Sequence, residues 1–425
     1  MATVVALTVS QSQQAAATPL HTDIVTEGTM TRKLEGVSND DIAKLEQHFG
    51  TSFELKLKNL PASSAFKPAP WTGSPWPIYQ DSINCEWDPN QPSPAEKYAK
   101  AFGLDVKTFM DSVSAQNGID SMIPANATAC SADTECNRED ANLVCAKRAG
   151  KTSGICITMW YAMDQAWVQA AIFEKEPKCT VTHNGVTFQP MDIKGLITDV
   201  YADVDLSYVF TGSRFRGNIN DKVDQYGRHS VLNMKCFGEG SVDNPSSHSD
   251  RTYRDLNPGF LHIAATNMLG RLNSTFVFDK EANYGVINQP AVGFEVDEQT
   301  VMTTAEDAKK FYKLDEYIWN QNATSIAFVK ARLTGVKNMM DDDGKLLSGP
   351  NEDFVTVSNY TYLLELNDAE EIVGGEWLYE SNDVHPDFLW FPTSKPAANT
   401  TTSIGLSYAS VKELIEASAA CAKMA

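Results

Sequence analysis

The stretch GICITMWYAMDQAWVQAA, residues 154–171, is almost entirely apolar, yet it carries the adjacent polar residues Asp164 and Gln165. Taken as one helix, it places apolar side chains on nearly every face, which is typical of a helix buried on all sides. A buried carboxylate without a partner is costly, so Asp164 must be paired, be protonated or stand in a solvent-lined site. The structural alternative is an Asp at the helix start, where its charge meets the positive end of the helix dipole.

The segments after residue 320 predict a sheet. Alternating apolar and polar residues run through TSIAFVKARLTGV (324–336), DFVTVSNYTYLLEL (353–366) and EEIVGGEWLY (370–379), as in an antiparallel meander. A buried helix followed by such strands predicts an α+β fold. A central buried helix packed on an antiparallel sheet is also how papain-like and transglutaminase-like folds present a nucleophile, at the start of the helix.

The first sixty residues differ from the rest of the chain. Residues 1–20 hold a short apolar run followed by small residues, a weak signal-peptide pattern because no Lys or Arg precedes the run. Residues 21–60 contain one predicted helix, SNDDIAKLEQHFG (38–50), and are interpreted as the remnant of a pro-segment. We therefore predict that the main domain covers residues 61–425.

The composition excludes two classes of partner. The 425 residues include 55 acidic and 35 basic side chains, for a net charge of -20. This charge repels nucleic-acid phosphates and anionic lipids. No run approaches the roughly 18 apolar residues that a membrane-spanning helix needs. We therefore predict no nucleic-acid partner and no membrane span.

Four of the eight cysteines lie in one loop-rich insert, residues 130–156. Their spacing contains no C-x2-C pair, which favours two disulfides, and a tetrahedral zinc site is the alternative. Disulfides together with five N-x-S/T sequons indicate a secreted, glycosylated protein of the extracellular space or cell wall, although Asn- and Thr-rich loops also produce sequons by chance. The cysteines are Cys130, Cys136, Cys145 and Cys156, and the sequons begin at Asn126, Asn273, Asn322, Asn359 and Asn399.

Two histidines are candidate catalytic bases. His262 stands near the start of a predicted helix, and a histidine satisfied within the core is its structural alternative. Asp279 ends the next predicted strand and Asn288 follows it, so either could orient an imidazole as the third member of a Cys-His-Asp or Cys-His-Asn site. His385 and Asp387, which lie among aromatic residues, form the second candidate pair.

Several separate stretches resemble one protein family. GVINQPAVGFEVDEQ (285–299), HNGVTFQPMD (183–192) and HPDFLW (385–390) are similar to the oomycete transglutaminase elicitors, secreted cell-wall glycoproteins of plant pathogens. The resemblance implies a calcium-dependent acyl transfer. A cysteine thiolate attacks a glutamine carboxamide of a protein, ammonia leaves, and a lysine or another amine takes the acyl group. The implied partners are Gln- and Lys-containing substrate proteins, cell-wall proteins and plant receptors.

The resemblance also places the catalytic helix. The family's Cys-His-Ala-Trp matches Asp164, Gln165, Ala166 and Trp167, so a carboxylate stands at the position of the nucleophile. No cysteine occurs from residue 157 to residue 178. Three hypotheses follow: an acyltransferase with another nucleophile, a non-catalytic member that binds wall proteins or acts on plant defence, and a secreted papain-like hydrolase.

The peptide that resembles the family's elicitor departs from it at the recognition residues. The family's Trp before Asn-Gln-Pro is Ile287 here, and the basic residues flanking Gly-Phe are Val292 and Glu295. Of the family's key Trp and Pro, this chain retains Pro290, which weakens the case for recognition by plant receptors. The elicitor-like positions are Ile287, Asn288, Gln289, Pro290, Gly293 and Phe294.

Overall fold

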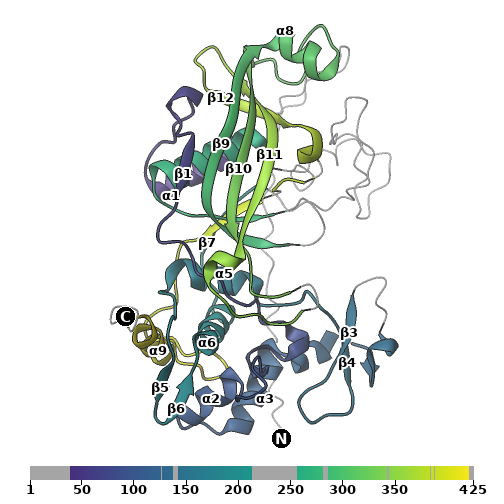
Figure 1. Ribbon diagram of the computed structural model, residues 1–425, viewed down its shortest axis with the longest axis vertical. Helices are drawn as coiled ribbons and strands as arrows, with labels where there is room; N and C mark the ends of the chain where they lie inside the picture. Colours follow the sequence, from purple (N-terminus) through teal and green to yellow (C-terminus); the bar gives the residue numbers. More distant parts are fainter. Residues whose placement is uncertain are drawn as a thin grey trace, which may run out of the picture.

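The computed structural model describes residues 39–125, 127–136, 142–212, 256–280, 286–341, 344–382, 384–386 and 388–420. Within these parts the chain forms a sheet-rich lobe and a helix-rich lobe along the long axis of the molecule (Figure 1). The helices in these parts are all too short or too polar to span a membrane.

The sheet-rich lobe is built on one antiparallel sheet with the strand order β12-β11-β10-β9-β8-β13-β7, and β1 pairs with β9 beside this path. The predicted meander is confirmed, because β10, β11 and β12 are consecutive neighbours in the sheet. The bounds are β1 Ser63–Ala65, β7 Tyr208–Gly212, β8 Val277–Asp279, β9 Asn288–Thr303, β10 Ser325–Val336, β11 Val355–Leu366, β12 Ile372–Trp377 and β13 Phe388–Pro392.

Most of the longer helices gather in the other lobe, and α5 lies where the two lobes meet (Figure 1). Two α-helices continue as short π-helices, Thr266–Arg271 after α7 and Ala308–Tyr312 after α8. The predicted α+β class is therefore confirmed. The helix bounds are α1 Asn39–Phe49, α2 Pro94–Ala101, α3 Val106–Asn117, α5 Asp164–Phe173, α6 Pro190–Ala202, α7 Pro258–Ala265, α8 Thr304–Asp307 and α9 Tyr408–Ala420.

Two large hydrophobic cores correspond to the two lobes. The first includes Trp167 of α5 and Ile197 of α6, both fully buried. The second fills the space between α7 and the sheet, and Leu261 and Phe294 belong to it. The helix α1 also packs into this second core through Leu45. The interpretation of residues 21–60 as a pro-segment remnant stays a prediction.

The insert is a small three-stranded sheet held by two disulfides. Its strands are β2 Ala129–Cys130, β3 Leu143–Ala146 and β4 Gly154–Thr158, and a separate hairpin joins β5 Val181–His183 to β6 Val186–Phe188. Disulfides link Cys130 to Cys145 and Cys136 to Cys156, so the prediction of disulfides rather than zinc is confirmed. Cys179 is also disulfide-bonded.

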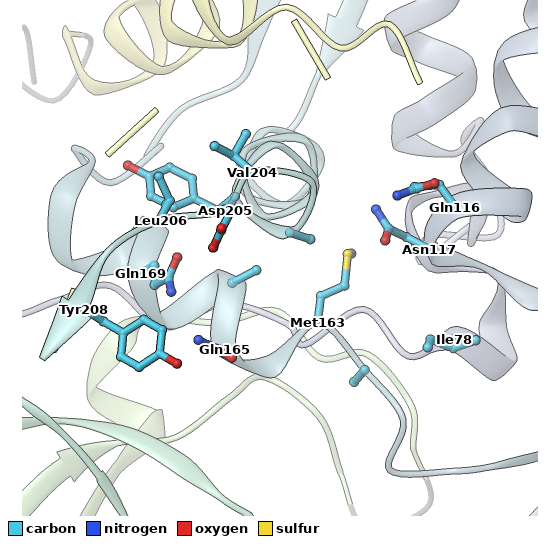
Figure 2. Close-up of a pocket in the computed structure, with 14 residues that line it drawn as sticks. Ile78, Gln116, Asn117, Met163, Gln165, Gln169, Val204, Asp205, Leu206 and Tyr208 are labelled. Atoms are coloured by element: carbon cyan, nitrogen blue, oxygen red, sulfur yellow. The ribbon is translucent and has the colours of Figure 1, made fainter. Parts of the chain in front are cut away.

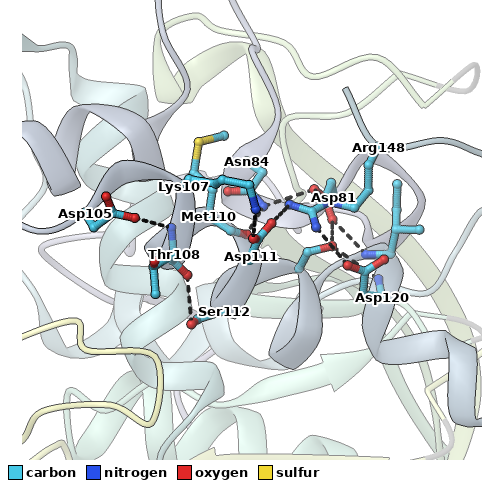
Figure 3. Close-up of polar contacts among 12 residues, drawn as sticks. Asp81, Asn84, Asp105, Lys107, Thr108, Met110, Asp111, Ser112, Asp120 and Arg148 are labelled. Atoms are coloured by element: carbon cyan, nitrogen blue, oxygen red, sulfur yellow. Dashed lines mark hydrogen bonds and ion pairs between the residues drawn. The ribbon is translucent and has the colours of Figure 1, made fainter. Parts of the chain in front are cut away.

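One arginine anchors the insert to the helical lobe (Figure 3). Arg148 lies 2.8 Å from Asp111, 2.9 Å from Asp120 and 3.5 Å from Asp81. Asp81 also accepts hydrogen bonds from the Ser114 hydroxyl and from a backbone N–H, so its carboxylate is well satisfied. The contacts fix the insert against α3.

The central helix is shorter than the sequence pattern predicts. Residues 154–158 form β4, and α5 begins at Asp164. Between them the chain pairs with the proline-rich segment around Pro77, because Ile78 N–H donates to Tyr161 and Met163 N–H donates to Pro75. The prediction of one helix buried on all sides is therefore wrong for residues 154–163.

Candidate functional site

Asp164 occupies the first position of α5. This is the placement expected if its charge meets the positive end of the helix dipole. One carboxylate oxygen accepts a 2.9 Å hydrogen bond from Nε1 of Trp167, which is one helical turn away. The other accepts bonds from the backbone N–H and the side-chain Nδ2 of Asn288, at 3.2 and 3.0 Å. The carboxylate thus joins the start of α5 to the start of β9.

Two opposing effects set the charge of Asp164. Burial raises the pKa of this carboxyl above its usual range, and hydrogen bonds from Trp167, Asn288 and Asn338 act in the opposite direction. A carboxylate that accepts several bonds has its lone pairs committed to those donors. Burial is the larger effect, so Asp164 takes up a proton more readily than an exposed Asp although its oxygens accept several hydrogen bonds.

The structure brings Asn288 to Asp164 and pairs Asn288 with a second predicted residue, Asp279. Asp279 and Asn288 are directly opposite each other in the β8–β9 pairing, so their side chains lie on the same face of the sheet. Asp279 accepts a 2.8 Å bond from the N–H of Ile287, and Oδ1 of Asn288 accepts a 2.9 Å bond from Nε1 of Trp390. Asn288 is therefore the central link of this group.

The sequence patterns assign no role to three residues that complete this arrangement, Trp167, Asn338 and Trp390. The spacing of three residues between Asp164 and Trp167 on a helix is a signal that could have predicted their contact. Asn338 and Trp390 come from distant segments, and no local pattern connects either of them with Asp164.

His262 is not part of this group. It lies in α7 with 1% of its surface exposed, and its Nδ1 is 2.8 Å from the hydroxyl of Tyr362. Its ring meets the edge of Phe294, which is six residues along β9 from Asn288, or about 20 Å at the rise of a strand. Burial lowers the pKa of His262 to about 3, so the imidazole is neutral. The structure supports the alternative of a satisfied core histidine.

His385 is buried as well, and the second candidate pair is only partly described. Nδ1 of His385 donates to the backbone oxygen of Ser381 at 2.7 Å, and its ring stacks on Trp377. Asp387 lies outside the described residues. The role of this pair stays a prediction.

Comparison with known proteins identifies the family. The transglutaminase elicitor family model matches residues 41–242 and 233–421. This chain belongs to the transglutaminase elicitor family. The crystal structure of the GP42 transglutaminase from Phytophthora sojae is 49% identical in sequence, with a TM-score of 0.77 over 91% of this chain and 100% of that chain. No curated protein matches.

Within this family member, the elicitor-like residues run from the surface into the sheet. Ile287 is 40% exposed, whereas Asn288, Gln289 and Pro290 are buried at the start of β9. Phe294 is buried in the second core. Gly293 pairs with Ala65 of β1 and with Thr334 of β10. In the folded protein, Ile287 is therefore the elicitor-like side chain most open to a partner.

Cys85 is the free cysteine of the described chain. Burial, and then the charges of Glu86 and Asp81, raise the pKa of its thiol to about 11. A thiol with this pKa is protonated at neutral pH and is a poor nucleophile. Its sulfur lies 3.7 Å from the side-chain oxygen of Gln80, and none of the described histidines bonds to it. Cys85 therefore lacks the surroundings of a catalytic thiolate.

No cluster of three carboxylates among the described residues is placed to share an ion. Calcium is held by several oxygen ligands, mostly carboxylates and carbonyls. Among these residues, the side chains close enough to share an ion are Cys130, Cys136 and Cys156, and all three are in disulfides. The calcium implied by the family resemblance stays a prediction with no residues assigned to it.

Two surface features involve the segments that meet at the start of α5. The segments that meet there expose four large side chains, with 55% of Trp160, 44% of Tyr161, 51% of Tyr208 and 40% of Ile287 accessible. We call these four residues the apolar rim. Beside the rim, a pocket of about 340 Å³ is lined by Gln165 and Gln169 of α5 (Figure 2). Asp164 is not among the residues that line this pocket.

Proposed function

We propose that this protein is a secreted member of the transglutaminase elicitor family that binds proteins without transferring acyl groups. The observation that carries the proposal is the state of Asp164. It stands at the helix start that matches the family's nucleophile, and Trp167, Asn288 and Asn338 donate to its carboxylate. None of the described histidines is among these partners.

The chemistry argues against turnover at this position. Acyl transfer of the family type needs a thiolate and a base that takes up and returns its proton. A carboxylate could attack a carboxamide only by forming an anhydride, and its hydrogen bonds reduce its nucleophilicity further. Cys85, the free thiol of the described part of the chain, is protonated and has no imidazole partner there. Amine incorporation is therefore not expected from the unmodified protein.

Support for protein binding comes from the apolar rim. Large apolar side chains exposed in one region are a common mark of protein interaction sites, and Trp and Tyr are enriched at the energetic centres of interfaces. Trp160 and Tyr161 precede α5 in the chain, and Ile287 is next to Asn288. Asn288 bonds to Asp164 at the helix start that the family resemblance connects with a glutamine-containing substrate. We therefore propose cell-wall or plant-defence proteins that contain Gln and Lys as the partners.

Support for secretion comes from the disulfides and the sequons. Stable disulfides are typical of oxidising compartments. The sequon residues Asn273, Asn322, Asn359 and Asn399 are all exposed, as glycosylation requires, and Asn126 lies outside the described residues.

The proposal is tested by incorporation of a labelled amine into casein, with calcium and with a chelator. Three proteins are compared: the unmodified chain, Asp164→Cys combined with Asn288→His, and Asp164→Ala combined with Asn288→His as the control without sulfur. The histidine is placed at position 288 because this side chain already bonds to Asp164 and faces Asp279, which could orient an imidazole.

We expect the unmodified protein and the alanine control to be silent, and the cysteine variant to give measurable incorporation. Binding of immobilised casein by the unmodified protein, without release of ammonia, completes the expected result. Incorporation by the unmodified protein would overturn the proposal. Release of ammonia or peptide without incorporation would indicate a hydrolase instead, and absence of casein binding would contradict the binding part.

A further inference from the structure

The segment that follows β9 forms a cap over one end of the sheet. It begins with α8 and its π-helix, and we call residues 304–320 the cap. Figure 1 shows α8 at the end of the sheet-rich lobe that lies farthest from the helix-rich lobe. Trp319 of the cap belongs, with Phe328 and Leu363 of the sheet, to a third hydrophobic core that is separate from the two large ones. The cap can therefore loosen locally while the other two cores stay closed.

Asp307, the last residue of α8, is buried without a hydrogen-bond partner. None of its surface is exposed, and neither carboxyl oxygen has a donor within bonding distance among the described residues. Buried carboxyl groups usually accept several hydrogen bonds, because an ionised carboxylate without donors is very costly in an apolar site. The closed cap therefore accommodates Asp307 far better as a neutral, protonated acid than as an anion.

A second buried carboxyl group, on the sheet, acts on Asp307. Glu365 of β11 is fully buried, and its like charge disfavours ionisation of Asp307. The Tyr317 hydroxyl and the Asn320 side-chain amide donate to the two oxygens of Glu365, at 2.6 and 2.7 Å. The cation that favours ionisation of Asp307 is Lys310, whose side chain is exposed to solvent. Burial first, and then the charge of Glu365, raise the pKa of Asp307 to about 7.

Strand β12 brings a third acid to this group. Glu376 is buried on the same face of the sheet as Glu365. The Tyr317 hydroxyl keeps its proton, because burial and the charges of Glu365 and Glu376 raise the pKa of Tyr317 well above its usual range. Among the described residues, no three carboxyl groups are placed to share a metal ion. A proton is therefore the cation that this group of acids can take up.

Strands β9 and β10 bring no charge to Asp307. Farther along this face of the sheet, Lys330 and Glu298 are exposed and form an ion pair with each other at 2.7 Å. The buried groups described around Asp307 thus include acids and hydroxyls but no cation. The positions of β9 and β10 on this face near the cap are Thr300, Met302, Ile326 and Phe328.

We propose that Asp307 is a proton-operated latch of the cap, which is closed when this carboxyl group is protonated and loosened when it loses its proton. The ionised carboxylate gains hydration when the cap opens, whereas the neutral acid gains little by leaving the apolar core. Opening uncovers side chains of the third core, among them Trp319 and Phe328. The latch thus converts a rise in pH into exposure of an apolar surface at the end of the molecule away from Asp164.

The direction of the pH effect follows from the two states of Asp307. In the open cap the carboxyl group titrates near its ordinary pKa of 3.8, and in the closed cap it titrates near 7. Below about pH 4 both states are protonated, so pH has no effect through this group. Between about pH 4 and pH 7 the closed state is the one that binds the proton, so the opening equilibrium rises by up to about tenfold for each pH unit. Above about pH 7 the cap stays loosened.

Hydrogen exchange of the full chain, followed by mass spectrometry, tests the latch. The readout is the protection factor of peptides from residues 304–320, corrected for intrinsic exchange rates, at pH 5 and at pH 7.5. We expect this protection to fall at least tenfold between the two pH values, and binding of the dye ANS, which reports exposed apolar surface, to rise. Protection that does not fall, a fall shared equally by the rest of the sheet, or unchanged dye binding would overturn the inference.

Two substitutions connect the effect to Asp307. Asp307→Asn replaces the acid with a neutral group of the same shape, so protection of the cap at pH 7.5 should equal that at pH 5. The exposed Asp315→Asn, a matched change in the same cap, should keep the full pH dependence. The opposite result for either variant contradicts the latch. Each protein is compared with itself at the two pH values, so a general loss of stability does not affect the result.

A third variant tests the neighbouring charge. Glu365→Gln removes the like charge that acts on Asp307, so the midpoint of the fall in protection should move to lower pH. A midpoint that stays in place would show that Glu365 does not act on Asp307, and the buried acids would then not be the cause of the opening.

Discussion

The Asp164 region and the His262 region both contact β9, and they show what an ionisable residue becomes in different surroundings. At the start of β9, Asp164 is partly buried and its carboxylate accepts bonds from Trp167, Asn288 and Asn338. Further along the strand, His262 lies in an apolar core, and its ring contacts the Tyr362 hydroxyl. The first surroundings supply hydrogen-bond donors to the carboxyl group, and the second disfavour a charged imidazole.

Burial acts on the two groups in opposite directions. Burial disfavours the charged form of each group. It therefore raises the pKa of the Asp164 carboxyl and lowers the pKa of the His262 imidazole. Hydrogen bonds offset the penalty at Asp164. At His262 burial alone lowers the pKa, so the imidazole stays neutral and has a structural role. The predictions below test this difference, from the largest expected effect to the smallest.

The largest effect concerns pH. The folded-state pKa of His262 is about 3 against an ordinary value of 6.5, so the stability from the neutral imidazole is present above about pH 6.5 and is lost as pH falls toward 3. The loss due to this group should reach roughly 4 kcal/mol by pH 3. His262→Gln should remove this part of the acid dependence, measured by urea unfolding at several pH values. An unchanged acid dependence in the variant would show that His262 does not titrate as a core residue.

The next effect concerns truncation in the two regions. His262→Ala should lower the free energy of unfolding by about 3 kcal/mol, because it leaves a cavity and an unpaired Tyr362 hydroxyl. Asp164→Ala should cost about 1 kcal/mol, since water can reach the donors of a partly exposed site. Chemical denaturation at neutral pH measures both. If Asp164→Ala lowers the free energy of unfolding more than His262→Ala does, Asp164 contributes more to stability than His262, contrary to this prediction.

A smaller effect isolates the hydrogen bonds at Asp164. Asn288→Ala removes the side-chain donor, so the pKa of Asp164 should rise further. The indole N–H resonance of Trp167 reports this titration because it donates to the same carboxylate. The exposed Asn359→Ala is the matched control and should leave the titration in place. No shift in Asn288→Ala would mean that its amide does not stabilise the anion.

The smallest effect is expected one residue away. Gln165 is exposed and forms no bond to a described residue, so Gln165→Ala should change the free energy of unfolding by no more than about 0.5 kcal/mol. Comparison with Asp164→Ala in the same denaturation experiment measures how sharply the structural role ends at Asp164. A cost equal to that of Asp164→Ala would extend the anchored region along α5.

The sequence by itself determined the elements whose causes are local. The predicted helix 38–50 is found at Asn39–Phe49, and the predicted strands 324–336 and 353–366 are found at Ser325–Val336 and Val355–Leu366. Side-chain periodicity and end signals act within a few residues, so they can be seen without a fold. The grouping of cysteines likewise predicted two disulfides, although not their pairing.

Tertiary structure alone decided the partners of Asp164 and the isolation of His262. Asp164 and Asn288 are 124 residues apart, and the sequence could suggest both without showing that they bond to each other. The sequence offered His262 as a candidate partner on the same footing as Asn288, although the fold places His262 in a different core. The start of α5 at Asp164 was also decided by a distant contact, with the segment around Pro77. Local patterns determine which residues can form a helix, a strand or a charge, whereas the packing of distant segments determines burial and hydrogen-bond partners, and these decide whether a charge is held.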